Sequence, residues 1–304
     1  MINVVTVTNH IGDRIKMELA RPENSGFAIK KIDGLGSVKA DINMTDVSTY
    51  DGSVYNSSRL GTRNIIFDIV FINNPGETIE DVRHRAYRFF QTKTLVNLRF
   101  ETSNRTLETD GYVETNEPEI FSEREGCRVS IICPFPYFYG VGEDNKITFS
   151  SIEPMFEFPF SNESFTEPLL EMGSIKTIYG KNITYKGDAD TGIKITLHAY
   201  GEIANITIYN TITRESMRID TDKIAILTGK GIIANDEIII NTVKGDKYIW
   251  LLRDGSYVNI LNCLDKNVDW FQLRNGPNIF AYTAEYGSGN LKCEIQNRVI
   301  YKGV

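Results

Sequence analysis

Hydrophobic and polar residues alternate over most of the chain, in short runs of β-branched and aromatic residues separated by Gly, Asn or Asp turns. Residues 64–72 (NIIFDIVFI) and 192–200 (GIKITLHAY) are examples. Alternation within the second run predicts a half-buried antiparallel strand. Its apolar positions are Ile193, Ile195 and Leu197, and its polar positions are Lys194, Thr196 and His198. Turn signals recur too often in the second half of the chain for long helices.

One segment, residues 78–91, has the periodicity of a helix instead. Thr78 is expected to cap this helix, with Asp81 completing a variant of the capping box, and Asp81 and Arg85 have the spacing of an i,i+4 ion pair. The apolar stripe should lie on a sheet. It consists of Ile79, Val82, Ala86, Phe89 and Phe90.

The same helix carries three arginines, Arg83, Arg85 and Arg88. Two interpretations stay open for them: a solvated helix face, or a contact with a neighbouring subunit.

Two Pro- and Phe-rich segments, residues 134–142 and 152–161, interrupt the strand pattern. Proline cannot donate to a sheet ladder, so these segments favour sheet edges and linkers. We therefore expect a mainly β protein with a first domain at 1–140, a linker at 141–164 and a second domain at 165–304. The first domain is a β-sandwich with one helix, and the second is a β-sandwich.

Composition places the chain among ordinary globular proteins of about two domains. Its 304 residues include 33 Lys and Arg against 40 Asp and Glu, a net charge of -7. A mildly acidic chain without basic clusters is a poor candidate for gripping nucleic acid. The first thirty residues show no secretory signal, which indicates maturation in a cytoplasm, and no apolar run is long enough to span a membrane.

Candidate chemistry is sparse. The three histidines stand apart from any nucleophile motif, and the cysteines are too widely spaced for a zinc or redox motif, so we expect buried, unpaired thiols. Residues 187–192 (GDADTG) only weakly resemble a calcium loop. We expect no catalytic residue, no cofactor and no metal. The residues considered are His10, His84, His198, Cys127, Cys133, Cys263 and Cys293.

Four aromatic residues of the second half could form a stacking platform for sugar, or could pack in the core: Tyr248, Trp250, Tyr257 and Trp270. In a strand, positions 248, 250 and 252 share one face. Because Trp250 should then point where Leu252 points, the core is favoured.

A set of short segments, in order along nearly the whole chain, resembles the distal tail proteins of siphophages, the long-tailed bacteriophages. In the first half these are the strand ending at Phe71 and residues 76–83, 110–113 and 133–135. In the second half they are residues 185–188, 191–192, 270–273, 275–278 and 301–304.

The resemblance implies a non-enzymatic virion protein, made in the host cytoplasm and located at the phage tail tip. It implies a homo-hexameric ring that joins the tail tube protein to a tail-associated lysin-like tip protein, and in some cases carries a receptor-binding protein. The N-terminal half would form the ring. The C-terminal half would be a galectin-like or carbohydrate-module-like sandwich, a shape that does not bring sugar binding with it.

Charge is consistent with DNA passing through such a ring, because six copies would carry about -42 and an acidic lumen would not hold DNA. Residues 35–46 and 49–56 are hairpin candidates that could pair across subunits and so hide edge strands. The expected subunit contacts are Leu35, Val38, Tyr50 and Tyr55, together with the three helix arginines.

Three alternatives remain open. The chain could be a baseplate or tailocin adaptor with the same domains, which a different ring position or symmetry would show. It could be a carbohydrate-binding module for cell-wall glycans, which loss of binding on Trp250→Ala or Trp270→Ala would show. It could be a hydrolase, which turnover of cell-wall polymers would show.

Overall fold

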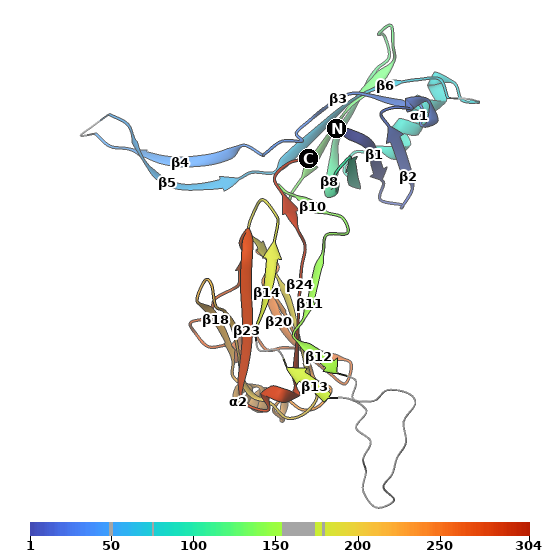
Figure 1. Ribbon diagram of the computed structural model, residues 1–304. Helices are drawn as coiled ribbons and strands as arrows, with labels where there is room; N and C mark the ends of the chain where they lie inside the picture. The colour runs from blue at the N-terminus through green and yellow to red at the C-terminus, as the bar shows by residue number, and fades with distance from the viewer. Residues whose placement is uncertain (49–50, 75, 154–173, 178–179) are drawn as a thin grey trace, which may run out of the picture. The chain divides into compact units, whose positions relative to one another are not determined.

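The computed structural model describes residues 1–48, 51–74, 76–153, 174–177 and 180–304 (Figure 1). The chain divides into two compact units. Unit 1 comprises Met1–Glu143 and Ile300–Val304, and unit 2 comprises Asp144–Val299. Unit 2 is therefore inserted in the sequence of unit 1, near its end.

These boundaries differ from the expected domains at 1–140 and 165–304. Strand β11 (Asn145–Thr148), inside the expected linker, pairs with β24 (Leu291–Asn297) of unit 2. Strand β25 (Ile300–Tyr301) pairs with β10 (Phe138–Gly140) of unit 1. The Pro-rich segment at 134–142 does lie next to the boundary between the units, but a local pattern cannot show which sheet a short segment joins. Residues 154–173 of the expected linker lie outside the described residues.

Unit 1 is built on one continuous antiparallel sheet, the main sheet, in the order β2-β1-β7-β8-β9-β6-β3; in addition, β10 pairs with β8, and β25 pairs with β10. The register of β8 against β9 shifts between Val113 and Thr115, a bulge of the kind that bends a strand. Phe67 of β6 and Phe100 of β7 stack with ring centroids 6.4 Å apart, although β8 and β9 separate their strands in the sheet. The sheet thus closes over itself as a sandwich.

The strand predicted at 64–72 is confirmed as β6, where Ile65, Phe67, Ile69 and Phe71 are buried on one face. The elements of unit 1 are β1 (Ile2–Thr8), β2 (Arg14–Glu18), β3 (Phe27–Asp33), β4 (Ala40–Asp46), β5 (Ser53–Leu60), β6 (Arg63–Phe71), α1 (Ile79–Phe89), β7 (Leu95–Thr102), β8 (Thr106–Glu119), β9 (Gly126–Cys133), β10 and β25, with a 3-10 turn at Pro22–Asn24.

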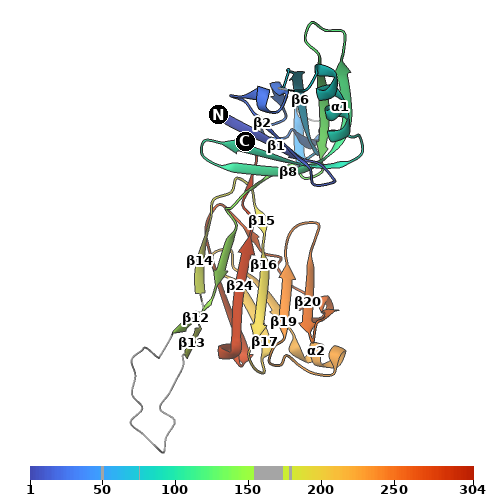
Figure 2. The same ribbon diagram turned by 90° about the vertical axis from the view of Figure 1, so that its right-hand side faces the viewer.

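Helix α1 lies against the main sheet, near β6 (Figure 2). The predicted cap is present: the Thr78 hydroxyl accepts from the Asp81 N–H, and the Asp81 carboxylate accepts from the Thr78 N–H at 2.9 Å. The predicted Asp81–Arg85 pair is wrong. Because Asp81 is committed to the cap, Arg85 pairs with Glu77 at 3.1 Å instead.

Unit 2 is a sandwich of two antiparallel sheets (Figures 1 and 2). One, the β16 sheet, runs β11-β24-β16-β19-β20-β21, and the other, the β17 sheet, runs β14-β23-β17-β18. The predicted alternation is confirmed, since Ile193, Ile195 and Leu197 are buried. The remaining elements are β12 (Ser150–Glu153), β13 (Ser174–Thr177), β14 (Gly180–Tyr185), β15 (Thr191–Gly192), β16 (Lys194–Ala199), β17 (Ala204–Asn210), β18 (Glu215–Ile219), α2 (Thr221–Thr228), β19 (Glu237–Asn241), β20 (Tyr248–Arg253), β21 (Ser256–Asn259), β22 (Gln272–Leu273) and β23 (Gly276–Tyr286), with 3-10 turns at Leu261–Cys263 and Ser288–Asn290.

A second helix, α2, was not predicted from the sequence. The Asp220 carboxylate accepts from the N–H groups of Asp222 and Lys223 and so caps its start. Gly229 ends it in the left-handed conformation, φ 78°. An acidic cap followed nine residues later by glycine is a signal for a short helix, and only its two-turn length hides it among the surrounding turns. Neither helix in the described chain has the length and apolar character needed to cross a lipid bilayer.

Candidate functional site

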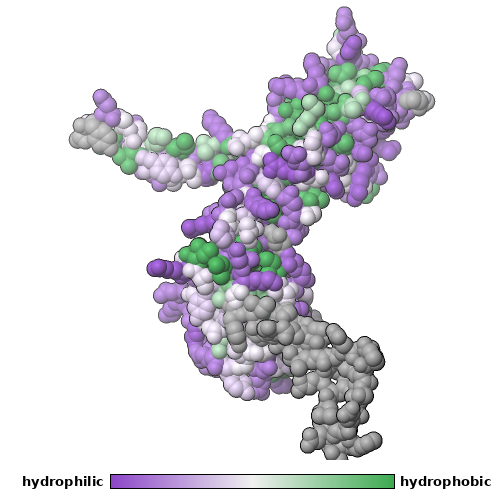
Figure 3. Space-filling view, in the orientation of Figure 1, coloured by the Kyte–Doolittle hydropathy of each residue, from purple (hydrophilic) through white to green (hydrophobic). Residues whose placement is uncertain are grey.

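A two-stranded hairpin, β4 paired with β5, is a highly exposed part of unit 1, and we call it the arm (Figure 1). Nearly every residue of both strands is exposed, and no other described strand pairs with either of them. An isolated hairpin is at best marginally stable in water, so an arm of this kind gains most from binding a surface. Hydrophobic residues are visible along it in Figure 3. Its exposed apolar side chains are Ile42 (56% exposed), Met44 (53%), Val54 (44%) and Tyr55 (59%).

Three of the four contact residues expected outside the helix lie on or beside this arm. Tyr55 is exposed on β5, opposite Met44 in the register. Val38 lines an open pocket of about 520 Å³ at the root of the arm, and Leu35 is half-buried, its carbonyl accepting from the Val304 N–H. Tyr50 lies outside the described residues. The segments expected to pair with other subunits pair with each other within the chain.

Beneath the root of the arm lies Arg63, a buried cation that the sequence did not reveal. Only 1% of it is exposed, and within the described part of the chain no carboxylate pairs with it. Its guanidinium stacks over the Phe138 ring at 4.2 Å, and burial lowers its pKa. All its bonds go to backbone carbonyls, which belong to Gly34, Gly36 (2.6 Å), Pro136 (2.7 Å) and Lys302 (2.8 Å). Arg63 therefore ties the root of the arm to the C-terminal segment.

The three helix arginines do not form a common face. Arg83 is bound to Glu125 at 2.7 Å and is 15% exposed in its side chain. Arg85 pairs with Glu77, donates to the Ser25 carbonyl and lies 5.0 Å from the Phe27 ring centroid. Of the three, only Arg88, in the last turn, is exposed. Arg83 and Arg85 thus anchor α1 within unit 1, and Arg88 alone points outward.

In unit 2, three of the four candidate platform aromatics form one cluster. The rings of Tyr248 and Trp250 stack at 4.2 Å, and Tyr257 meets Trp250 edge-on at 5.5 Å. Trp270 instead contacts the Lys247 ammonium, 5.0 Å from its ring centroid. The cluster is half-exposed.

The expectation that Trp250 points into the core is wrong. In β20 the buried residues are Ile249 and Leu251, so the opposite face, with Tyr248 and Trp250, lies outward. Strand periodicity groups Trp250 with Leu252 correctly, but it does not say which face is inside.

Within the described residues, no group of three or more His, Cys, Asp and Glu side chains could hold a metal ion. His198 pairs with Glu237 at 3.0 Å on β16, and His84 contacts Glu80 on α1. All four cysteines are buried and free. Burial raises the pKa of Cys127 to about 12 and that of Cys133 to about 11, so both thiols stay protonated at neutral pH.

The loop with Asp188 and Asp190 is held as a turn, with both aspartates exposed. The Tyr185 hydroxyl donates to the Ala189 carbonyl at 2.9 Å, and the Asn275 amide donates to the Gly187 carbonyl at 2.9 Å. These two bonds hold the backbone of the loop in its turn.

Comparison with solved structures places the whole chain beside a phage protein. The SPP1 Dit protein (gp 19.1), described as a paradigm of the hub adsorption apparatus in phages that infect Gram-positive bacteria, matches with a TM-score of 0.62. The match covers 98% of this chain and 99% of that chain, at 13% sequence identity. The chain has the fold of SPP1 Dit. The mainly β fold class is confirmed, and so is the resemblance to distal tail proteins at the level of fold.

Two structures of the phage p2 baseplate in its activated conformation are more distantly similar, both with a TM-score of 0.45. The one with Sr matches at 13% identity over 97% of both chains, and the one with Ca at 11% identity over 100% of both chains. No protein-family model matches the chain. No curated protein sequence matches it either.

Proposed function

We propose that this protein is the structural hub of a phage tail tip, acting through assembly and without an enzymatic step. The observation that carries the proposal is the likeness to SPP1 Dit over practically the full length of both chains, so that both units and their order along the sequence are shared. An isolated domain of a common fold would support no such proposal, since common folds host many functions.

In this proposal six copies form a closed ring, and the arm supplies the contact between neighbours. The arm exposes a strand edge on each side and four apolar side chains. Such edges are normally covered, and a neighbouring copy in a cyclic assembly covers every arm in the same way. Arg88, exposed on α1, is the helix residue available for a further subunit contact.

The ring would join the tail tube protein on one side to a tip protein of the tail-associated lysin type on the other, with receptor-binding proteins attached to some such hubs. The net charge of -7 on each chain supports passage of DNA without retention, because like charges repel.

Electron microscopy of the intact particle tests the proposal. We expect antibody-labelled or reconstructed subunits to form an annulus of six copies at the tail end farthest from the capsid. An annulus of another symmetry or at another level would favour the rival baseplate or tailocin adaptor. Absence of the protein from the particle, or turnover of cell-wall polymers by the purified protein, would refute the structural hub.

The role of the arm is tested by Ile42→Asp. Burying one aliphatic side chain is worth roughly 1.5–3 kcal/mol, so its loss should weaken each subunit contact about 10- to 100-fold. Analytical ultracentrifugation over a concentration series measures the shift. Ile11→Asp is the matched control, because Ile11 is an isoleucine of unit 1 that is 69% exposed but lies outside the arm. Equal self-association of the two variants would show that the arm is not part of the subunit interface.

A second candidate function, glycan binding by unit 2, is supported by one specific observation: the Tyr248 and Trp250 rings are stacked on the outward face of the β16 sheet. Aromatic rings with an exposed face and a polar edge suit ligands of mixed polarity. Glycan-array binding that disappears with Trp250→Ala but persists with Trp270→Ala would support the cluster as the platform. Binding unchanged by Trp250→Ala would refute it.

A further inference from the structure

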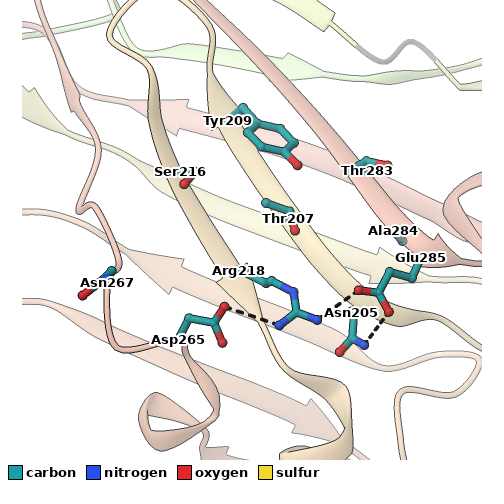
Figure 4. A pocket seen from close by; sticks show the side chains of 10 residues that line it. All are labelled: Asn205, Thr207, Tyr209, Ser216, Arg218, Asp265, Asn267, Thr283, Ala284 and Glu285. Carbon is teal, nitrogen blue, oxygen red and sulfur yellow. Dashed lines mark hydrogen bonds and ion pairs between the residues drawn. The ribbon is translucent and has the colours of Figure 1, made fainter.

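A hollow of about 480 Å³ lies on the outward face of the β17 sheet, on the side of unit 2 opposite to its core (Figure 4). The alternation of β17 creates this face, because Ile206 and Ile208 are buried while Asn205, Thr207 and Tyr209 between and beside them point outward. Strands β18 and β23 add polar residues at the same level, and the loop before β22 closes one side. The complete lining is Asn205, Thr207, Tyr209, Ser216, Arg218, Asp265, Asn267, Thr283, Ala284 and Glu285.

The floor of this hollow is an ordered bridge of charges. Arg218 lies between two carboxylates, with one nitrogen 3.4 Å from Asp265 and another 3.0 Å from Glu285 (Figure 4). The Asn205 amide donates to the other Glu285 oxygen at 2.8 Å. The side-chain Oδ1 of Asn205 in turn accepts from the Thr221 backbone N–H at 3.2 Å. The bridge is therefore tied to the backbone at its far end.

These contacts keep the charges fixed. Hydrogen bonds from Asn205 and Arg218 lower the pKa of Glu285, and the bonds to Glu285 and Asp265 raise the pKa of Arg218. One guanidinium between two carboxylates leaves a small excess of negative charge, which disfavours anionic ligands. The guanidinium nevertheless keeps N–H donors beyond those used in the bridge, since it carries five.

The rest of the lining consists of small neutral groups in register. Thr207 lies directly opposite Arg218 on one side and Thr283 on the other, and Ser216 pairs with Tyr209. A threonine or serine hydroxyl both donates and accepts, so three of them beside an arginine and two carboxylates offer alternating donors and acceptors over a short distance. Tyr209, 37% exposed, adds an aromatic surface at the edge.

A polar outer face is ordinary for an antiparallel sheet, and it accounts for the threonines alone. It does not account for a hollow closed by Asp265 and Asn267 from a separate loop, nor for an arginine oriented by two carboxylates in the middle of it. The volume of the hollow falls within the 300–1,000 Å³ of small-ligand sites, and its lining is more polar than is usual for them, which suits a ligand rich in hydroxyl groups.

We propose that this hollow binds an uncharged saccharide unit through its neighbouring hydroxyl groups. Pairs of hydroxyls on adjacent carbons each need a donor and an acceptor, which the Arg218 bridge supplies on the floor and Thr207 and Thr283 supply beside it. Tyr209 lies against the apolar face of the sugar ring. The site is separate from the Tyr248–Trp250 cluster, which belongs to the other sheet.

Titration of the full-length protein with a panel of methyl glycosides of glucose, galactose, rhamnose and N-acetylglucosamine tests the site, with ligand-observed NMR as readout. We expect at least one to bind in the millimolar range and methyl glucuronide, which is anionic, to bind at least fivefold more weakly than methyl glucoside. The double variant Thr207→Val, Thr283→Val keeps the shape and strand preference of both residues and should reduce binding at least tenfold.

Thr184→Val is the matched control, because Thr184 is an exposed threonine of the same sheet outside the hollow, and it should bind as the unchanged protein does. Arg218→Lys keeps the charge but loses the two-sided bridge, and should also lose most of the binding. No binding by any glycoside, or binding that survives the double variant or is lost only on Trp250→Ala, would overturn the proposal. The tail-hub function is tested separately on particles, so either proposal can be refuted while the other stands.

Discussion

At the scale of single residues, the least expected feature is a buried arginine, Arg63, that pairs with no carboxylate among the residues the structure describes. Arg63 is satisfied by carbonyl oxygens of residues from three separate segments of unit 1 and by the Phe138 ring. A cation in this position is far more demanding of its surroundings than an apolar residue, because every lost contact leaves buried polar groups unpaired. Arg63 therefore holds three segments together through one side chain: the root of the arm, the turn before β10 and the C-terminal segment.

We therefore expect Arg63→Met to cost unit 1 about 3 kcal/mol or more of its free energy of unfolding, since it leaves buried carbonyls without a donor. Hydrogen exchange of the β6 and β10 amides in a urea series measures this loss. The control is Arg59→Met on the arm, where the side chain is 84% exposed and paired with Asp41 at 3.5 Å, and where a change below about 0.5 kcal/mol is expected. A loss at Arg63 no larger than at Arg59 would show that the carbonyl cluster is solvated without the arginine.

At the scale of elements, the sequence predicts those helices and strands whose formation depends on local periodicity. The strands β6 and β16 and the helix α1 follow from alternation or from a helical stripe with a capping residue. Elements set by distant partners were missed. The bulge in β8 arises where its register against β9 shifts, and β25 forms only by pairing with β10, which lies on the far side of unit 2 in the sequence.

The candidate sites divide in the same way. Strand periodicity predicts that Tyr248 and Trp250 share a face, but only the packing of Ile249 and Leu251 against the second sheet shows that the face is outward. The sequence predicts that the arm segments form hairpins, but not that they pair with each other. Strands β4 and β5 pair because they are adjacent in sequence, where closing the loop costs the least entropy. The hollow around Arg218 was not predicted at all, because its residues come from four separate parts of the chain.

At the scale of the whole molecule, the insertion of unit 2 gives unit 1 a discontinuous sequence, and the two ends of the gap meet. The Tyr301 hydroxyl donates to the Glu143 carboxylate, and the Arg105 guanidinium lies 4.5 Å from the Tyr301 ring centroid. Burial and this carboxylate raise the pKa of Tyr301 to about 12. The chain thus leaves unit 1 and returns to it at nearly one point.

This geometry predicts that each unit folds without the other. Replacing residues 144–299 by a Gly-Ser linker of about four residues, which reaches some 13 Å when extended, should leave unit 1 folded, with its β9 and β10 strands still paired to their neighbours. Residues 144–299 alone should fold as the sandwich. Both tryptophans, Trp250 and Trp270, belong to unit 2, so their fluorescence reports that unit only, whereas circular dichroism of the shortened chain reports unit 1.

Cooperative urea unfolding of each piece, at a midpoint near that of the same unit in the whole chain, is the expected result. An unfolded or aggregated shortened chain would show that unit 1 needs unit 2 to close its gap. Breaking the closure alone separates the two explanations: Tyr301→Phe in the full-length chain removes only the hydroxyl bond to Glu143, and should lower the free energy of unfolding of unit 1 by the roughly 1.5–3 kcal/mol of a hydrogen bond to a charged group. A fold that withstands this change but not the deletion would place the dependence in unit 2 itself.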